Sequence, residues 1–98
     1  MSDDPTITDP DKYVAVFENE RVRVLEYKDT PGAKTNRHRH PDSVVCAVTS
    51  FQRKVHTDGG VRDVALEAGQ VMWLPAQEHV GENCGLTDTH VILVELKR

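Results

Sequence analysis

The chain has 98 residues and a net charge of −4, and 38% of its residues are hydrophobic. This length allows one domain with one modest core, and the low apolar fraction favours a homodimer that buries additional surface. The lysines and arginines form no basic stripe, so we expect no nucleic-acid partner. The sequence contains neither an apolar run of membrane length nor a signal-peptide pattern, so we expect a cytoplasmic protein without a membrane partner.

The N-terminal segment differs in composition from the remainder. Residues 1–12 contain four Asp and two Pro and almost no apolar side chain. We therefore expect a flexible N-terminal arm over residues 1–12, or a segment that becomes ordered against a partner subunit. A single domain is expected over residues 13–98.

Short β-prone runs separated by turn residues make up the rest of the chain. Alternating and β-branched side chains predict strands. Asp58-Gly59-Gly60 predicts a tight hairpin, and Pro and Gly in residues 29–32 predict a turn. No segment keeps a helical period, so we expect an all-β, antiparallel sandwich or barrel. The expected strands are residues 13–17, 21–27, 34–40, 43–49, 51–57, 61–66, 70–74, 79–83 and 90–96.

Three histidines fall where such a fold can bring them together. His38 and His40 are two residues apart in an expected strand, so their side chains project from the same face. If the strand that carries His79 lies beside them, three imidazoles converge. Neutral imidazole is the commonest metal ligand, and three of them leave positions open as in a catalytic site. We therefore predict that His38, His40 and His79 bind a divalent metal.

The spacing around these histidines resembles the two motifs of the cupin family. Residues 32–40 contain Gly, five residues and His-Arg-His, residues 69–75 contain Gly, five residues and Pro, and residues 79–83 contain His, three residues and Asn. The resemblance spans roughly residues 21–96. It implies a small single-domain cupin, an antiparallel double-stranded β-helix of the jelly-roll kind, with a metal at the mouth of the barrel.

Two departures from the family pattern affect the expected metal. Ser43, Val44 and Val45 stand where the family has a Glu ligand, and the segment 75–79 is one residue shorter than usual. A site with three His and one Glu implies manganese, iron or nickel. A site with three His alone also suits zinc or copper, and it leaves the charge of the ion to be compensated by an anionic ligand.

More loosely, the chain is similar to the short cytoplasmic cupins associated with β-alanine degradation. This similarity depends on Val22-Arg-Val24, on Trp73-Leu-Pro75-Ala and on the closing Val-Glu-Leu-Lys. It concerns the fold and the location more than the reaction.

Other polar side chains have alternative roles. His90 begins an apolar face at residues 90, 92, 94 and 96, so we expect it to face the core, either as a base close to the metal ligands, as a fourth ligand or as a hydrogen-bonded core histidine. His56 is expected in solvent. Arg37 and Arg39 alternate with the ligand histidines and are expected to point away from the metal.

The remaining candidates lie close to the two motifs. Glu78 adjoins His79 and is either a general base or, because it points to the opposite face, a surface residue. Gln77 is a candidate donor to a ligand at the rim. Cys46 is either a small buried hydrophobe or a cavity thiol, and Trp73 either packs in the core or forms a wall of the pocket. Neither Cys46 nor Cys84 has zinc or redox spacing, so both are expected as free thiols.

Three functions remain open at the level of the sequence. The first is a metal-dependent enzyme of the isomerase, lyase or dioxygenase type that acts on a small carboxylate- or carbonyl-containing metabolite. The second is a non-catalytic module that binds a metal or a small ligand. The third is a metal-free structural cupin. No residue is assigned as catalytic, because the fold alone hosts many chemistries.

Overall fold

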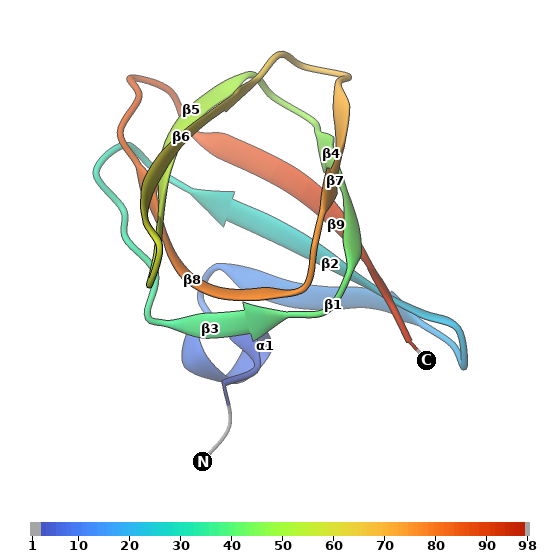
Figure 1. Ribbon diagram of the computed structural model, residues 1–98. Helices are drawn as coiled ribbons and strands as arrows, with labels where there is room; N and C mark the ends of the chain where they lie inside the picture. Colours follow the sequence, from blue (N-terminus) through green and yellow to red (C-terminus); the bar gives the residue numbers. More distant parts are fainter. Residues whose placement is uncertain (1–2, 98) are drawn as a thin grey trace.

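The computed structural model describes residues 3–97, which form two antiparallel sheets that curve around a common interior (Figure 1). Eight of the nine expected strands begin and end within two residues of the observed ones. The elements are α1 (Pro5–Thr8), β1 (Tyr13–Glu18), β2 (Val22–Asp29), β3 (His38–His40), β4 (Ser43–Ala47), β5 (Phe51–Thr57), β6 (Gly60–Leu66), β7 (Val71–Leu74), β8 (Gln77–Asn83) and β9 (Thr89–Leu96).

The strand order is that of a jelly roll. One sheet has the order β1-β2-β9-β4-β7, and the other has the order β3-β8-β5-β6. Strands that are distant in the sequence therefore become neighbours: β2 pairs with β9, and β3 pairs with β8. The all-β, double-stranded β-helix fold expected from the sequence is confirmed.

Two glycines of the sequence motifs lie in the turns that precede strands β3 and β7. Gly32 and Gly69 both have φ of +88°, and the amide of the following residue donates to the carbonyl three residues earlier in each turn. This is the third position of a type II turn, where a side chain would be strained. These glycines therefore serve the chain reversals before β3 and β7.

The strand that carries the first two histidines is shorter than expected. Residues 34–40 were predicted to be extended throughout, but β3 covers only His38–His40, and Lys34 forms an isolated bridge with Glu82. The amide of Asn36 donates to the Asp9 carboxylate at 2.9 Å instead of joining a ladder. This contact keeps the Asn36 amide out of the ladder, and β3 begins later than expected, at His38.

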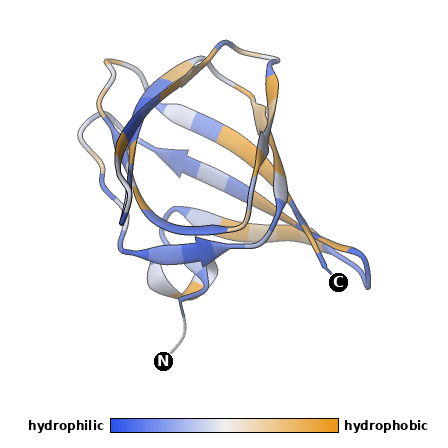
Figure 2. Ribbon diagram, in the orientation of Figure 1, coloured by the Kyte–Doolittle hydropathy of each residue, from blue (hydrophilic) through white to orange (hydrophobic). Residues whose placement is uncertain are grey.

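The face of β9 that points to the core is opposite to the expected one. The inner positions Thr89, Val91, Leu93 and Glu95 are buried. The outer positions of the same strand are His90, Ile92, Val94 and Leu96. Both faces of this strand carry apolar residues, so the alternation of the sequence does not show which face points to the core (Figure 2 shows the middle of β9 as hydrophobic). The core cluster consists of Tyr13, Leu25, Tyr27, Val45, Ala47, Phe51, Leu74, Val91 and Leu93.

Residues 3–12, expected to belong to a flexible arm, pack on the barrel. Asp4 caps α1 by accepting from the amide of Thr6, and Pro5 occupies the first turn. Asp9 is 2% exposed and Pro5 is buried. The helix contacts β1 and β3 (Figure 1). In residues 3–97, no helix combines the length and the apolarity needed to cross a membrane.

Candidate metal centre

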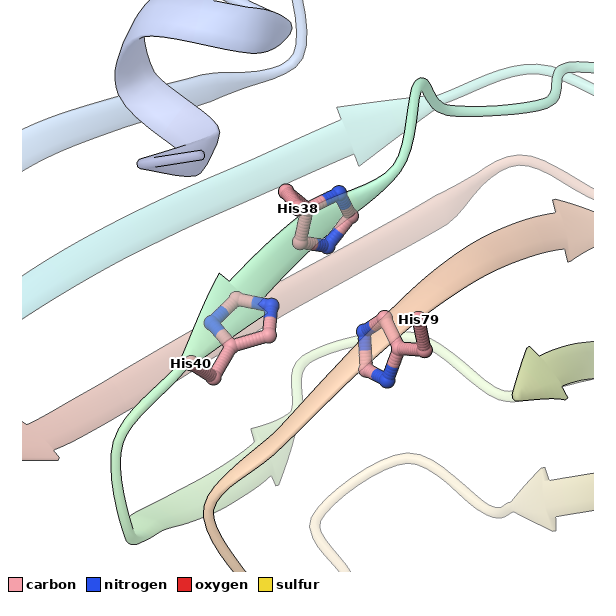
Figure 3. Close-up of side chains that lie close together, drawn as sticks. All are labelled: His38, His40 and His79. Atoms are coloured by element: carbon pink, nitrogen blue, oxygen red, sulfur yellow. The ribbon is translucent and has the colours of Figure 1, made fainter. Parts of the chain in front are cut away.

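The three predicted histidines converge on the inner side of the barrel wall. In the β3–β8 ladder His38 is directly opposite His79, and His40 lies two residues along from His38. The ring centroids are 4.8 to 5.1 Å apart, and the three ligand nitrogens lie within 4.8 Å of one another. Figure 3 shows the rings on adjacent strands, turned toward a common point. All three side chains are buried.

Each imidazole is oriented by an acceptor oxygen at Nδ1. The acceptor is the Asn36 carbonyl for His38 (2.8 Å), the Glu95 carboxylate for His40 (2.8 Å) and the Gln77 side-chain oxygen for His79 (2.7 Å). These oxygens can only accept, so Nδ1 carries the proton and Nε2 carries the lone pair. Three lone pairs are thereby available to one ion, which is the arrangement of imidazole metal ligands.

His38 and His79 are neutral at physiological pH. Burial, followed by repulsion from His40, lowers the pKa of His38 to about 4. Burial, followed by repulsion from His40 and His38, lowers the pKa of His79 to about 3. A metal competes with protons for imidazole, and here the proton is already disfavoured. The donor set thus fits a divalent transition-metal ion that prefers nitrogen ligands.

Tyr13 faces the same group of nitrogens. Its hydroxyl lies 3.4 Å from Nε2 of His38 and 3.5 Å from Nε2 of His40. Burial raises the pKa of Tyr13 well above its ordinary value, so the phenol stays protonated. From the sequence this residue was expected only as the start of a strand. In the structure it supplies a hydroxyl beside the ligand atoms.

Two buried carboxylates lie behind the imidazoles. Glu95 is 2% exposed and, besides His40, binds the guanidinium of Arg23 at 2.8 Å. An Asp9 oxygen lies 3.7 Å from Nδ1 of His38. They supply negative charge near the site although the family's Glu ligand is absent. Glu95 lies on the face of β9 opposite to His90, which was expected inside, so no local pattern in the sequence revealed its position beside His40.

A cavity of about 90 Å³ adjoins the histidines inside the barrel. His40 and His79 form part of its wall, and most of the remaining wall is apolar. Arg53 also lines it, but Arg53 is bound to Asp29 at 2.7 Å and donates to the Tyr27 hydroxyl at 2.9 Å. The cavity therefore combines a polar side, formed by the imidazoles, with an apolar side.

Several other candidates lie away from this centre. His90 is on the outer face, where Nε2 is 2.8 Å from Glu26, so the expected core position is wrong. His56 is half-buried and contacts Glu82 at 3.0 Å. Glu78 points outward and pairs with Arg37, which confirms its surface position.

The outer faces of β4 and β7 hold two further candidates. Cys46 is half-buried on the outer face of its sheet, so it is neither a core residue nor a cavity thiol. Trp73 is 50% exposed, and its neighbour Met72 lines the cavity instead. The alternation along these strands was correct, but the sequence did not show which face is inside. Cys46 and Cys84 are free thiols, as expected.

Comparisons with known proteins agree with this geometry. Over 82 residues the chain is 35% identical to a protein of Pseudomonas aeruginosa named "Beta-alanine degradation protein BauB", an alignment that covers 82% of this chain and 86% of that protein. A cupin domain from Bordetella pertussis superposes with a TM-score of 0.82 at 31% identity, over 88% of this chain and 92% of that one. A double-stranded β-helix protein from Klebsiella pneumoniae gives 0.67 at 22% identity, over 87% and 72%. None of the models of known protein families matches the chain.

Proposed function

The chain belongs to the cupin superfamily, and on this premise we propose that it is a metal-dependent enzyme acting on a small carboxylate- or carbonyl-containing metabolite. His38, His40 and His79 would hold the ion. The observation that carries the proposal is the fixed tautomer of all three: each Nδ1 is occupied by an acceptor, so each Nε2 carries the lone pair that a metal ion would accept.

The bound ion would supply Lewis-acid polarisation of a substrate oxygen or, if it is iron, activation of dioxygen. The protein's own contribution follows from its side chains. Gln77 and Glu95 hold the rings of His79 and His40 in place. Tyr13 keeps its proton and presents a hydrogen-bond donor beside His38 and His40. The apolar cavity wall limits water around the reacting group.

The relative named for β-alanine degradation favours a small carboxylate of amino-acid metabolism as the substrate class. This substrate class leaves the reaction open between isomerisation, elimination and oxygen-dependent cleavage. The metal that the protein retains separates these classes, because iron supports the last and zinc or nickel supports the first two.

One observation favours the alternative of a cupin that works without metal as a binding or structural module. In the described residues, no buried side-chain nitrogen or oxygen lacks a hydrogen-bond partner. The polar groups of the site are thus already satisfied, Tyr13 being the partner of His38 and His40. The two alternatives differ in whether the purified protein retains a metal.

We also propose that two copies of the chain pair through the outer face of the five-stranded sheet. Val14, Phe17, Val71 and Trp73 are each at least half exposed on this face. Within residues 3–97 no other segment covers them. A second copy would bury this apolar surface.

The proposal is tested by the metal content of protein purified without a histidine tag, measured by elemental mass spectrometry. We expect close to one ion per chain in the native protein and a loss of most of it in both His38→Ala and His79→Ala, because two imidazoles bind a divalent ion far more weakly than three. His90→Ala is the matched control, since this histidine lies outside the site and should retain the ion.

Circular dichroism would establish that each variant is folded. If folded native protein takes up no zinc, iron, nickel, manganese or copper after reconstitution, the enzyme proposed here is wrong. The metal-free binding or structural module then remains.

A further inference from the structure

Arg62 projects into the barrel on the same side as the histidines. It is directly opposite Val55 in the β5–β6 ladder, and Val55 is opposite Gly81 in the β5–β8 ladder. Residues directly opposite one another share a face of the sheet, and Gly81 shares its face with His79, two residues earlier. Arg62 accordingly lines the cavity that His40 and His79 also line. Its side chain is exposed, which places it at the open side of the cavity.

Arg62 has no partner among residues 3–97, unlike the other arginines of the barrel wall. Arg53 is bound to Asp29, and the outward-facing Arg37 and Arg39 both contact Glu78. In the described residues, no carboxylate lies within ion-pair distance of Arg62. None of the described residues that line the cavity is Asp or Glu. An inward-facing cation is thus left without a counter-charge.

The charge of the site makes an anion the fitting ligand. Three neutral imidazoles leave the charge of a divalent ion uncompensated by its direct ligands, and Arg62 adds a positive charge at the same cavity. A negatively charged ligand would be attracted from both sides.

We propose that Arg62 binds the carboxylate of a small ligand whose second oxygen group faces His38, His40 and His79. A guanidinium offers two parallel N–H donors, the geometry that a carboxylate accepts. The cavity holds about 90 Å³, roughly three water volumes, so the part of the ligand inside it is limited to a few non-hydrogen atoms. Its apolar wall fits a short hydrocarbon link between the two oxygen groups. This inference rests on the proposed function and names the substrate class: short-chain carboxylates with a second oxygen function.

Malonate is the probe, because it carries a carboxylate at each end of one methylene group, and malonamide is its neutral analogue of similar shape. Binding is measured by isothermal titration calorimetry to zinc-loaded and to metal-free protein. We expect Arg62→Gln to raise the malonate Kd about 10- to 100-fold, the usual effect of losing a charge-assisted hydrogen-bonded pair. Arg62→Lys should fall between the two, since it keeps the charge but loses the paired donors.

Arg39→Gln is the matched control, because Arg39 is an exposed arginine on the outer side of the same wall and should leave the malonate Kd unchanged within about twofold. Malonamide should bind weakly and equally to the native protein and to Arg62→Gln. The inference is overturned if zinc-loaded native protein does not bind malonate, if Arg62→Gln binds it as the native protein does, or if malonamide binds as tightly as malonate.

The zinc content of every sample, measured in parallel, separates this inference from the proposed function. If the protein takes up zinc but Arg62 has no effect, only the inference about Arg62 fails. If no zinc is taken up, the proposed function fails, and the metal-free titration decides the role of Arg62. Malonate binding that depends on Arg62 would support its role as a carboxylate anchor, and malonate binding that is absent or independent of Arg62 would overturn it. Circular dichroism of each variant confirms that it is folded.

Discussion

Gln77 illustrates how a single uncharged side chain determines what His79 can bind. Its amide nitrogen donates to the Pro75 carbonyl at 3.1 Å, which turns the amide oxygen toward Nδ1 of His79. With Nδ1 protonated, Nε2 keeps its lone pair on the inner side of the barrel. The orientation of the His79 ring therefore depends on a residue two positions before it.

Gln77→Leu removes this acceptor while keeping a side chain of similar size. We expect metal affinity to fall about 10- to 100-fold, the usual effect of losing an outer-shell partner, because His79 can then adopt the other tautomer and rotate. Competition with a chromogenic chelator measures the affinity. Glu78→Gln is the control, since the adjacent side chain points outward and contacts arginines. Equal affinities of Gln77→Leu and native protein would contradict an orienting role.

At this scale the sequence revealed the three converging histidines but not what surrounds them. The spacing of His38 and His40 and the motif at residues 79–83 are local patterns, so a single sequence displays them. Glu95 reaches His40 across 55 positions, through strand pairings that no local pattern specifies. Arg62 likewise joins the cavity only because two ladders align it with Gly81.

The N-terminal helix is the element that the sequence predicted least well. It belongs to residues 1–12, whose four Asp and few apolar side chains predict a flexible arm. The structure shows that polar contacts hold it: the Asp9 carboxylate accepts from the Asn36 amide, and the Asn36 side chain donates to the Thr8 carbonyl at 2.9 Å. Because these contacts join segments 27 and 28 residues apart, composition alone could not reveal them.

Asp9→Ala tests whether α1 stabilises the barrel. The substitution leaves the Asn36 amide without its acceptor in a part-buried position. We expect the free energy of unfolding to fall by about 1–3 kcal/mol, measured as the urea midpoint of the metal-free protein. Asp11→Ala, in the exposed residue two positions later, should leave the urea midpoint nearly unchanged. A shift of equal size in both variants would mean that the segment contributes only through its net charge.

β9 shows a different limit at the scale of the element. Its position and length were predicted within one residue, but its inner face was wrong. The outer positions carry Ile92, Val94 and Leu96, which are as apolar as the inner Val91 and Leu93. A strand normally has one apolar face, so two such faces indicate that both are covered. The opposite sheet covers the inner face. What covers the apolar outer face is a question for the whole molecule.

The outer face of the five-stranded sheet is continuous across the ladders. One cross-strand row joins Val24, Val94, Val44 and Trp73, and a neighbouring row joins Ile92, Cys46 and Val71. The orange middle of β9 in Figure 2 lies at the centre of this face. Five strands about 4.8 Å apart, each about six residues long, give a face of roughly 25 by 20 Å. This is the order of size of one side of a standard interface, about 800 Å² per partner.

Val71→Glu and Val61→Glu together test the proposed dimer. Both valines are 59% exposed, but Val71 lies on this face and Val61 lies on β6 of the other sheet. We expect the native protein and Val61→Glu to sediment as dimers at about 50 µM, and Val71→Glu to dissociate, because two like charges would be buried across a symmetric interface. Analytical ultracentrifugation distinguishes the species. A native protein that sediments as a monomer, or a Val71→Glu variant that remains dimeric, would show that copies of this chain do not pair through the outer face of the five-stranded sheet.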